Sequence, residues 1–105
     1  MELFSPVNQP VETEELFGHI RSFFNSVENI SFRFQSPEGM IINTDRNFVQ
    51  TIMQNLTANA VQALRQTNNA EILWKAWQEE GRSYLSISDN GPGMKAEIQN
   101  NFETG

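Results

Sequence analysis

The sequence predicts an α+β fold of two layers, in which a mixed β-sheet is covered by helices on one face. Two kinds of periodicity support this prediction, because apolar residues recur with helical spacing in two segments and alternate with polar residues in others. The segments follow the order helix, two strands, helix, two strands, and hairpins that alternate with helices are typical of such layers. We expect one small domain, because the chain has only 105 residues.

The beginning of the chain predicts an extended segment followed by a helix. Residues 1–10 carry two prolines and little periodicity, so we expect a lead-in before a domain at residues 11–105. Three glutamates then crowd the start of the first helix, where carboxylates favour the positive end of the helix dipole. The apolar stripe of this helix consists of Leu16, Phe17, Ile20, Phe23, Phe24 and Val27.

The next segments predict a hairpin and a second helix. Apolar and polar residues alternate at 30–35, a shorter strand is expected at 40–43, and the turn residues 36–39 lie between them. This pattern is typical of a hairpin with a four-residue loop. Asn43 or Thr44 can cap the second helix, which we expect to run to about residue 66. Its apolar stripe consists of Val49, Ile52, Met53, Leu56, Ala60, Ala63 and Leu64.

Two further strands are predicted at residues 71–78 and 82–88, joined by a turn at residues 79–81. Successive side chains of a strand point to opposite faces of the sheet. Trp74 and Trp77 therefore lie on different faces. We expect one of them in the core and the other on the open face or against a partner.

The composition excludes several classes of function. Thirteen acidic and seven basic residues give a net charge of -6, which argues against nucleic-acid binding but not against a nucleotide held through magnesium and backbone amides. The absence of cysteine excludes disulfides and thiolate chemistry and favours the cytoplasm. No apolar run approaches the roughly 20 residues that span a bilayer, so we expect no direct membrane insertion.

Three amide side chains form a stripe on the second predicted helix. At 100° per residue, Asn55, Asn59 and Gln62 point within roughly 60° of one another. An amide carbonyl is a neutral, hard oxygen that suits Mg²⁺, which also keeps waters and bridges substrate phosphates. The alternative interpretation is a hydrated edge of the helix, because unpaired buried amides are avoided.

A sharp loop at residues 89–93 follows the last predicted strand. Its glycines permit close approach to a flat ligand. Asp89 is in phase with Leu85 and Ile87, so its carboxylate is expected to face the helix layer. A carboxylate there needs a donor, and the exocyclic amino group of a base such as adenine would supply one. The alternative is an ordinary turn, in which Asp and Gly are common.

The two features occur in this order and about 30 residues apart, and together they resemble two motifs of bacterial sensor histidine kinases. Residues 55–60 resemble the N box, residues 89–93 resemble the first glycine box, and Phe102-Glu103 resembles the start of the F box. The same superfamily, abbreviated GHKL, includes gyrase, heat-shock chaperone and mismatch-repair ATPases. The resemblance covers nearly the whole chain and implies a Bergerat-type ATP-binding fold.

The resemblance also implies a role for each candidate residue. Asn59 would be the Mg²⁺ ligand and Asn55 a neighbour of the metal or the phosphates, so these two would be the catalytic residues. Gln62 stands where many histidine kinases have lysine, and it would complete the cofactor-binding set on this helix. Asp89 would recognise adenine, while Gly91 and Gly93 would shape the adenine pocket. The implied cofactors are ATP and Mg²⁺.

Asn55 distinguishes between branches of the superfamily. The gyrase and chaperone branch has glutamate at this place, where it activates water. An amide cannot take a proton from water near neutral pH, so Asn55 favours phosphoryl transfer to a protein over hydrolysis. The implied partners are a dimerisation domain that carries the accepting histidine and, indirectly, a response regulator. The alternative function is a non-catalytic nucleotide-sensing or protein-docking module of the same fold.

Two departures qualify the resemblance. The second glycine box, which holds the phosphates in similar proteins, does not occur within the 105 residues. Residues 94–105 are polar and predict at most part of a short helix, so we expect the sheet to be incomplete at the C-terminus. His19, the only histidine, is followed by Ile20 and Arg21 rather than an acidic residue, and it is predicted to be a surface residue and not the phosphoacceptor.

Overall fold

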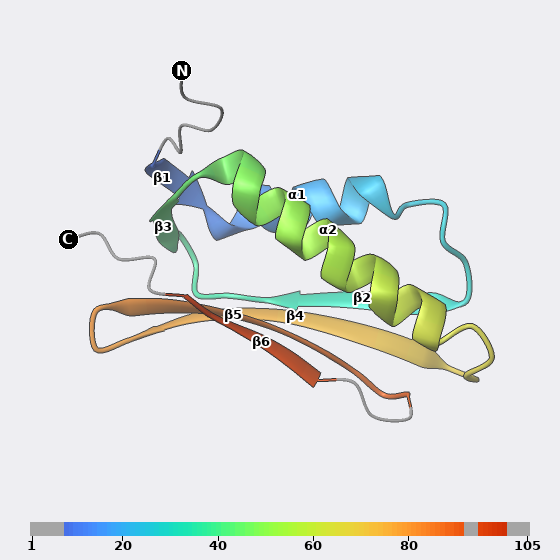
Figure 1. Ribbon diagram of the computed structural model, residues 1–105. Helices are drawn as coiled ribbons and strands as arrows, with labels where there is room; N and C mark the ends of the chain where they lie inside the picture. Colours follow the sequence, from blue (N-terminus) through green and yellow to red (C-terminus); the bar gives the residue numbers. More distant parts are fainter. Residues whose placement is uncertain (1–7, 92–94, 101–105) are drawn as a thin grey trace, which may run out of the picture.

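The computed structural model describes residues 8–91 and 95–100, which form two layers (Figure 1). In chain order the elements are β1 (Gln9–Glu12), α1 (Thr13–Phe23), β2 (Ile30–Gln35), β3 (Ile41–Thr44), α2 (Arg46–Ala63), β4 (Ala70–Glu79), β5 (Arg82–Asp89) and β6 (Lys95–Asn100). Both helices lie on the same face of the larger sheet (Figure 1). The predicted two-layer α+β fold is confirmed.

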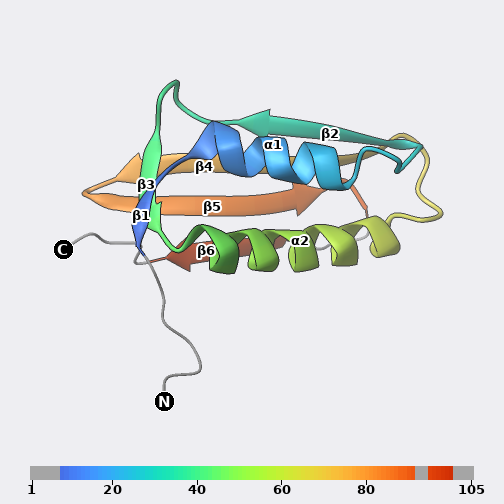
Figure 2. The same cartoon turned by 90° about the horizontal axis from the view of Figure 1, so that it is seen from above.

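The larger sheet has the strand order β2-β4-β5-β6. β2 is parallel to β4, whereas β5 is antiparallel to both β4 and β6, so the sheet is mixed as predicted. Seen from above, α1 lies over the β2 side of the sheet and α2 over the β5–β6 side (Figure 2). The smaller sheet, β1 with β3, lies at the end where both helices begin.

The predicted hairpin between residues 30–35 and 40–43 is wrong. β2 pairs with β4, so that Phe34 lies beside Trp74, and β3 pairs with β1. The reason is burial: β2 and β4 place continuous apolar rows side by side under the helices, whereas the short β3 buries only Ile42 and Thr44. β1 includes residues 9 and 10, so this strand crosses the boundary that we expected between lead-in and domain.

The ends of α2 also differ from the prediction. Asp45 is the N-cap, because its side chain accepts a hydrogen bond from the Phe48 backbone N–H at 3.1 Å. Asn43 and Thr44 do not cap the helix because both belong to β3. The helix ends at Ala63, a turn before the expected end.

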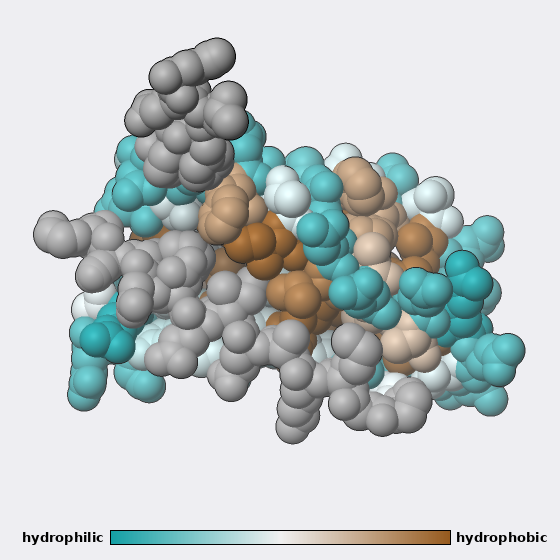
Figure 3. Space-filling view, in the orientation of Figure 1, coloured by the Kyte–Doolittle hydropathy of each residue, from teal (hydrophilic) through white to brown (hydrophobic). Residues whose placement is uncertain are grey.

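A single hydrophobic core lies between the helices and the sheet. Its fully buried side chains include Leu16, Ile20, Met53, Leu64, Ile72, Trp74 and Leu85. Hydrophobic side chains are visible along the seam between the two layers, with hydrophilic ones around them (Figure 3). Phe23 departs from its predicted stripe, being 57% exposed, because α1 ends at this residue.

The two tryptophans lie on different faces, as predicted. Trp74 is completely buried in the core, whereas Trp77 lies on the face without helices. There its ring stacks on Tyr84, its direct neighbour on β5, with ring centroids 5.3 Å apart and planes 11° apart. The expectation of one core tryptophan and one on the open face is confirmed.

Residues 95–100 form β6 rather than part of a helix, so this expectation is wrong. β6 pairs with β5 from Tyr84↔Gln99 to Ser88↔Lys95. An unpaired strand edge exposes backbone donors and acceptors, and pairing with β5 satisfies them. Gly93, Phe102 and Glu103 lie outside the described residues. Within the described part of the chain, no helix is long and apolar enough to cross a membrane.

Candidate nucleotide-binding site

The amide stripe lies on the outer face of α2, where Asn55, Asn59 and Gln62 are all exposed. In the described part of the chain, the side chains of Asn55 and Asn59 make no hydrogen bond within the protein. Exposure alone is also what the alternative of a hydrated helix edge predicts.

A buried hydrogen bond shows which side of α2 is turned to the sheet. The Thr57 hydroxyl accepts from the indole Nε1–H of Trp74 at 2.9 Å and donates to the Met53 carbonyl oxygen at 2.7 Å. In an α-helix, residues two positions away point about 160° away. Since Thr57 faces the sheet, Asn55 and Asn59 must face outward. Sequence analysis missed Thr57, although a buried indole N–H calls for an acceptor of this kind.

The second part of the site is the end of β5. Asp89 is half-buried and opposite Ile72 of β4, and its neighbours in phase, Leu85 and Ile87, are buried under the helices. Its Oδ1 accepts a hydrogen bond from the Gly91 backbone N–H at 2.8 Å. The carboxylate is thus held by the loop that follows it, and we find no other hydrogen bond to it within the described residues.

A side chain at Gly91 would force the buried Leu64 side chain to shift. A Cβ at this position would lie 2.6 Å from Leu64 Cδ2 and 3.1 Å from Asp89 Oδ1. Leu64 follows the last residue of α2 and is buried, so the loop after β5 packs directly against the end of this helix. The sequence predicted that the glycine would let the chain approach a ligand closely. In the structure, the chain at Gly91 approaches Leu64 closely. The structure thus joins Asp89 to the end of α2 through Gly91.

Asn90 makes three hydrogen bonds that sequence analysis did not foresee. Its Oδ1 accepts from the Glu71 N–H at 2.8 Å, and its Nδ2 donates to the Asn69 carbonyl at 2.9 Å. Its own backbone N–H donates to the Glu71 carbonyl at 3.3 Å. An asparagine directly after a strand, in a loop, was the only signal, because the partner turn is 19 to 21 residues away.

His19 is half-buried rather than on the open surface that we expected. Its Nε2 is hydrogen-bonded to the side-chain amide of Gln54 on α2. The imidazole therefore links the two helices, and its exclusion as the phosphoacceptor stays a prediction.

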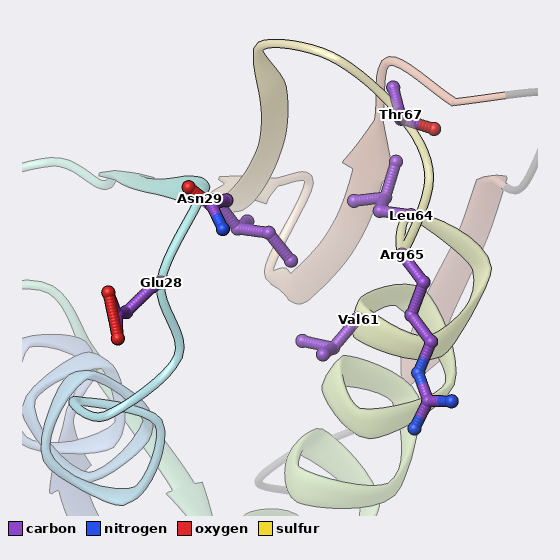
Figure 4. Close-up of a pocket in the computed structure, with 7 residues that line it drawn as sticks. Glu28, Asn29, Val61, Leu64, Arg65 and Thr67 are labelled. Carbon is purple, nitrogen blue, oxygen red and sulfur yellow. The ribbon is translucent and has the colours of Figure 1, made fainter.

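A pocket of about 150 Å³ lies beside the candidate site, between the end of α2 and the start of β2 (Figure 4). Its lining consists of Glu28, Asn29, Ile30, Val61, Leu64, Arg65 and Thr67. None of the predicted site residues lines it. Leu64 contributes both to this pocket and to the contact with Gly91, so it separates the pocket from the loop after β5.

A family model matches residues 44–105, which include α2, the end of β5 and the loop between β5 and β6. The family is described as histidine kinase-, DNA gyrase B- and HSP90-like ATPases. The match covers more than half of the chain. None of the curated proteins compared with the sequence matches it.

Solved structures of histidine kinases share the fold. The catalytic domain of histidine kinase ThkA has a TM-score of 0.73 and 22% identity over 84% of this chain and 62% of its own. Histidine kinase AdeS of Acinetobacter baumannii has a TM-score of 0.74 and 13% identity over 87% of this chain and 46% of its own. Full-length ShkA in complex with AMPPNP has a TM-score of 0.74 and 22% identity over 89% of this chain and 20% of its own.

The chain spans less than two thirds of these structures, and the likeness to them establishes the fold. The exposed amides of α2 and the carboxylate at the end of β5 both lie in the segment that the family model matches. The chain belongs to the family of histidine kinase-, DNA gyrase B- and HSP90-like ATPases.

Proposed function

We propose that the chain is the ATP-binding catalytic domain of a sensor histidine kinase. In this proposal it binds Mg·ATP in the cytoplasm and presents the γ-phosphate to a histidine on a separate dimerisation domain. The observation that carries the proposal is the joint placement of an exposed amide face on α2 and an anchored carboxylate at the end of β5, both within the family match. The chain of ShkA, with the same fold, is in complex with the adenine nucleotide AMPPNP.

The side-chain oxygens of the candidate site fit the proposed ligands. Because Oδ1 of Asp89 accepts a hydrogen bond from the Gly91 N–H, the other carboxylate oxygen can accept one from an adenine amino group. Asn59 offers its exposed amide oxygen to Mg²⁺, and Asn55 and Gln62 lie on the same face toward the metal or the phosphates. When bound, Mg²⁺ supplies charge neutralisation at the phosphates. No group of three histidine, cysteine or carboxylate side chains that could hold a metal occurs in the described residues, so the amides carry this assignment.

Transfer rather than hydrolysis is proposed because Asn55 cannot act as a general base. Phosphoryl transfer depends mainly on positioning and on charge stabilisation, which suits a site of amides and backbone groups. The transfer step and its partners are proposed for the whole protein, because the chain spans only part of the kinases that it resembles. A response regulator is the proposed indirect partner, and ThkA itself has been observed in complex with the response regulator TrrA.

The alternative function is a non-catalytic module that senses a nucleotide or docks a protein. The stacked Trp77 and Tyr84 on the uncovered sheet face favour docking, because paired aromatic rings are common at protein interfaces. A phosphorylation assay separates the two functions.

The test uses single substitutions in the full-length protein. Asn59→Ala should abolish Mg·ATP-dependent phosphorylation without unfolding the protein, measured with radiolabelled ATP and circular dichroism. Asn47→Ala is the matched control, because Asn47 is also exposed on α2 but lies off the amide stripe. Phosphorylation that persists in Asn59→Ala contradicts the metal assignment.

The adenine assignment has its own test. Asp89→Asn should weaken the binding of ATP far more than that of inorganic triphosphate, because only the contact with the base is lost. Calorimetry measures both affinities, and equal weakening of the two ligands contradicts the assignment.

A further inference from the structure

We propose that Asn90 is a positioning residue, which holds the Asp89 carboxylate in place for the base by tying the end of β5 to the turn before β4. This inference rests on the proposed function, since it concerns the same adenine contact. The hydrogen bonds of Asn90 carry it.

The Asn90 side chain acts as an additional backbone unit for the sheet. The ladder between β4 and β5 ends at the pair Ile72↔Asp89. One residue farther, the Asn90 and Glu71 backbones share a hydrogen bond, and the Asn90 amide then accepts from Glu71 N–H and donates to the Asn69 carbonyl. A side-chain amide has the same donor and acceptor pair as a peptide group. Asn90 thus extends the ladder beyond the last strand pair.

The partner turn contains a residue in the left-handed region. Asn69 has a φ of +54°, which asparagine adopts more readily than most residues other than glycine. Its carbonyl oxygen accepts a hydrogen bond from Nδ2 of Asn90 at 2.9 Å. The turn joins the end of α2 to β4, so the Asn90 side chain connects the loop after β5 to the segment that follows α2.

These bonds act on Asp89 through the backbone. The Asp89 carboxylate accepts its hydrogen bond from the Gly91 N–H, and Asn90 is the residue between them. Fixing Asn90 on the turn fixes the peptide groups on either side of it. The Gly91 N–H is then fixed as well, and it holds the Asp89 carboxylate in one direction. On the other side the loop packs against Leu64, since Gly91 lies in contact with it. Hydrogen bonds and packing therefore hold the carboxylate from two sides.

A purely structural role for Asn90 makes a different prediction. Asn90 is exposed, and a residue that only stabilises a turn would lower the stability of the protein without a specific effect on the base. A positioning residue changes the affinity for the adenine part of a nucleotide and leaves the affinity for the phosphates unchanged.

The experiment compares ATP with inorganic triphosphate, by calorimetry, in the full-length protein with Mg²⁺. For Asn90→Ala we expect ATP to bind about tenfold more weakly, the equivalent of about one lost hydrogen bond, and triphosphate to bind as before. Asn68→Ala is the matched control, because Asn68 is an exposed asparagine of the same turn. Equal weakening of ATP and triphosphate, or no change in ATP affinity, overturns the proposal.

A double-mutant cycle tests whether Asn90 acts through Asp89. In an Asp89→Asn background, Asn90→Ala should cause no further loss of ATP affinity. Additive losses would overturn the positioning role while the adenine site stands. If Asp89→Asn itself leaves ATP affinity unchanged, both the adenine assignment and this inference are wrong. These two failures are therefore distinguishable.

A milder variant serves if Asn90→Ala does not fold. The short hydroxyl in Asn90→Ser can reach one partner but not both, so we expect a loss between those of the wild type and the alanine variant. Amide hydrogen exchange gives a second readout, because the Glu71 N–H loses its acceptor Oδ1 and should exchange faster. Unchanged exchange at Glu71 overturns the proposal, as unchanged ATP affinity does.

Discussion

At the scale of single residues, Gly91 is the position with the least space. Because a methyl group there would meet Leu64 Cδ2 at 2.6 Å, Gly91→Ala should lower the free energy of unfolding by about 1–3 kcal/mol, the usual cost of overpacking. Urea denaturation measures it. Gly18→Ala in α1 is the control, since beyond the adjacent residues and the helix backbone nothing lies within 4 Å of its Cβ position, and it should raise stability by up to about 1 kcal/mol. Equal effects of the two substitutions would contradict this reading of Gly91.

The residues of the candidate site were predictable to different degrees. Asn59 and Asp89 follow from motif spacing and from the periodicity of one helix and one strand, which are local properties of the sequence. The hydrogen bonds of Asn90 and the contact of Leu64 with the loop after β5 were not predictable, because they depend on partners brought near by the fold. The metal and adenine roles of Asn59 and Asp89 stay predictions, and Gly93 lies outside the described residues.

At the scale of elements, a buried hydrogen bond between Thr57 and Trp74 joins α2 to β4. Thr57→Val keeps the shape of the side chain but leaves the buried Trp74 N–H without its acceptor, which should cost about 1–3 kcal/mol of stability. Thr51→Val is a matched control, because the Thr51 hydroxyl makes the same kind of bond to a backbone carbonyl four residues earlier but is exposed. Thermal unfolding compares them, and similar losses would show that the bond to Trp74 contributes little.

The turn between β4 and β5 offers a stabilising substitution. Its two residues, Glu80 and Gly81, have φ values of 52° and 76°, as a two-residue hairpin turn requires. Glutamate is a poor choice there, so Glu80→Asn should raise the free energy of unfolding by about 0.5–1 kcal/mol. Glu38→Gln removes the same charge from another exposed turn and is the control. A gain of equal size in the control would attribute the effect to charge instead.

The elements were predicted well where their signal was local. Both helices and the β4–β5 hairpin occur near the expected residues, because periodicity and turn residues specify them. The partner of β2 was predicted wrongly, since pairing with the neighbour in sequence is only a preference. The choice of β4 depends on burying apolar faces together, as with Phe32 beside Ile72. β6 was missed because its polar sequence carries no strand periodicity.

At the scale of the whole molecule, charge opposes the binding of a triphosphate. With a net charge of -6 and no second glycine box within its sequence, the 105-residue chain alone should bind ATP more weakly than micromolar and transfer no phosphate. Titration with Mg·ATP followed by heteronuclear NMR measures the binding, and radiolabelled ATP measures the transfer. Micromolar binding, or label on His19, would contradict the prediction.

The parallel pairing of β2 with β4 also has a consequence for how the chain folds. Ile30 of β2 pairs with Ala70 of β4, whereas Glu79 and Arg82 pair across a two-residue turn. Closing the longer loop costs more chain entropy and is the slower event. We therefore expect the hairpin of β4 and β5 to form first and β2 to dock later, once α2 bridges the distance. Until then the apolar edge of β4 is open, and chaperones or a neighbouring chain can compete for it.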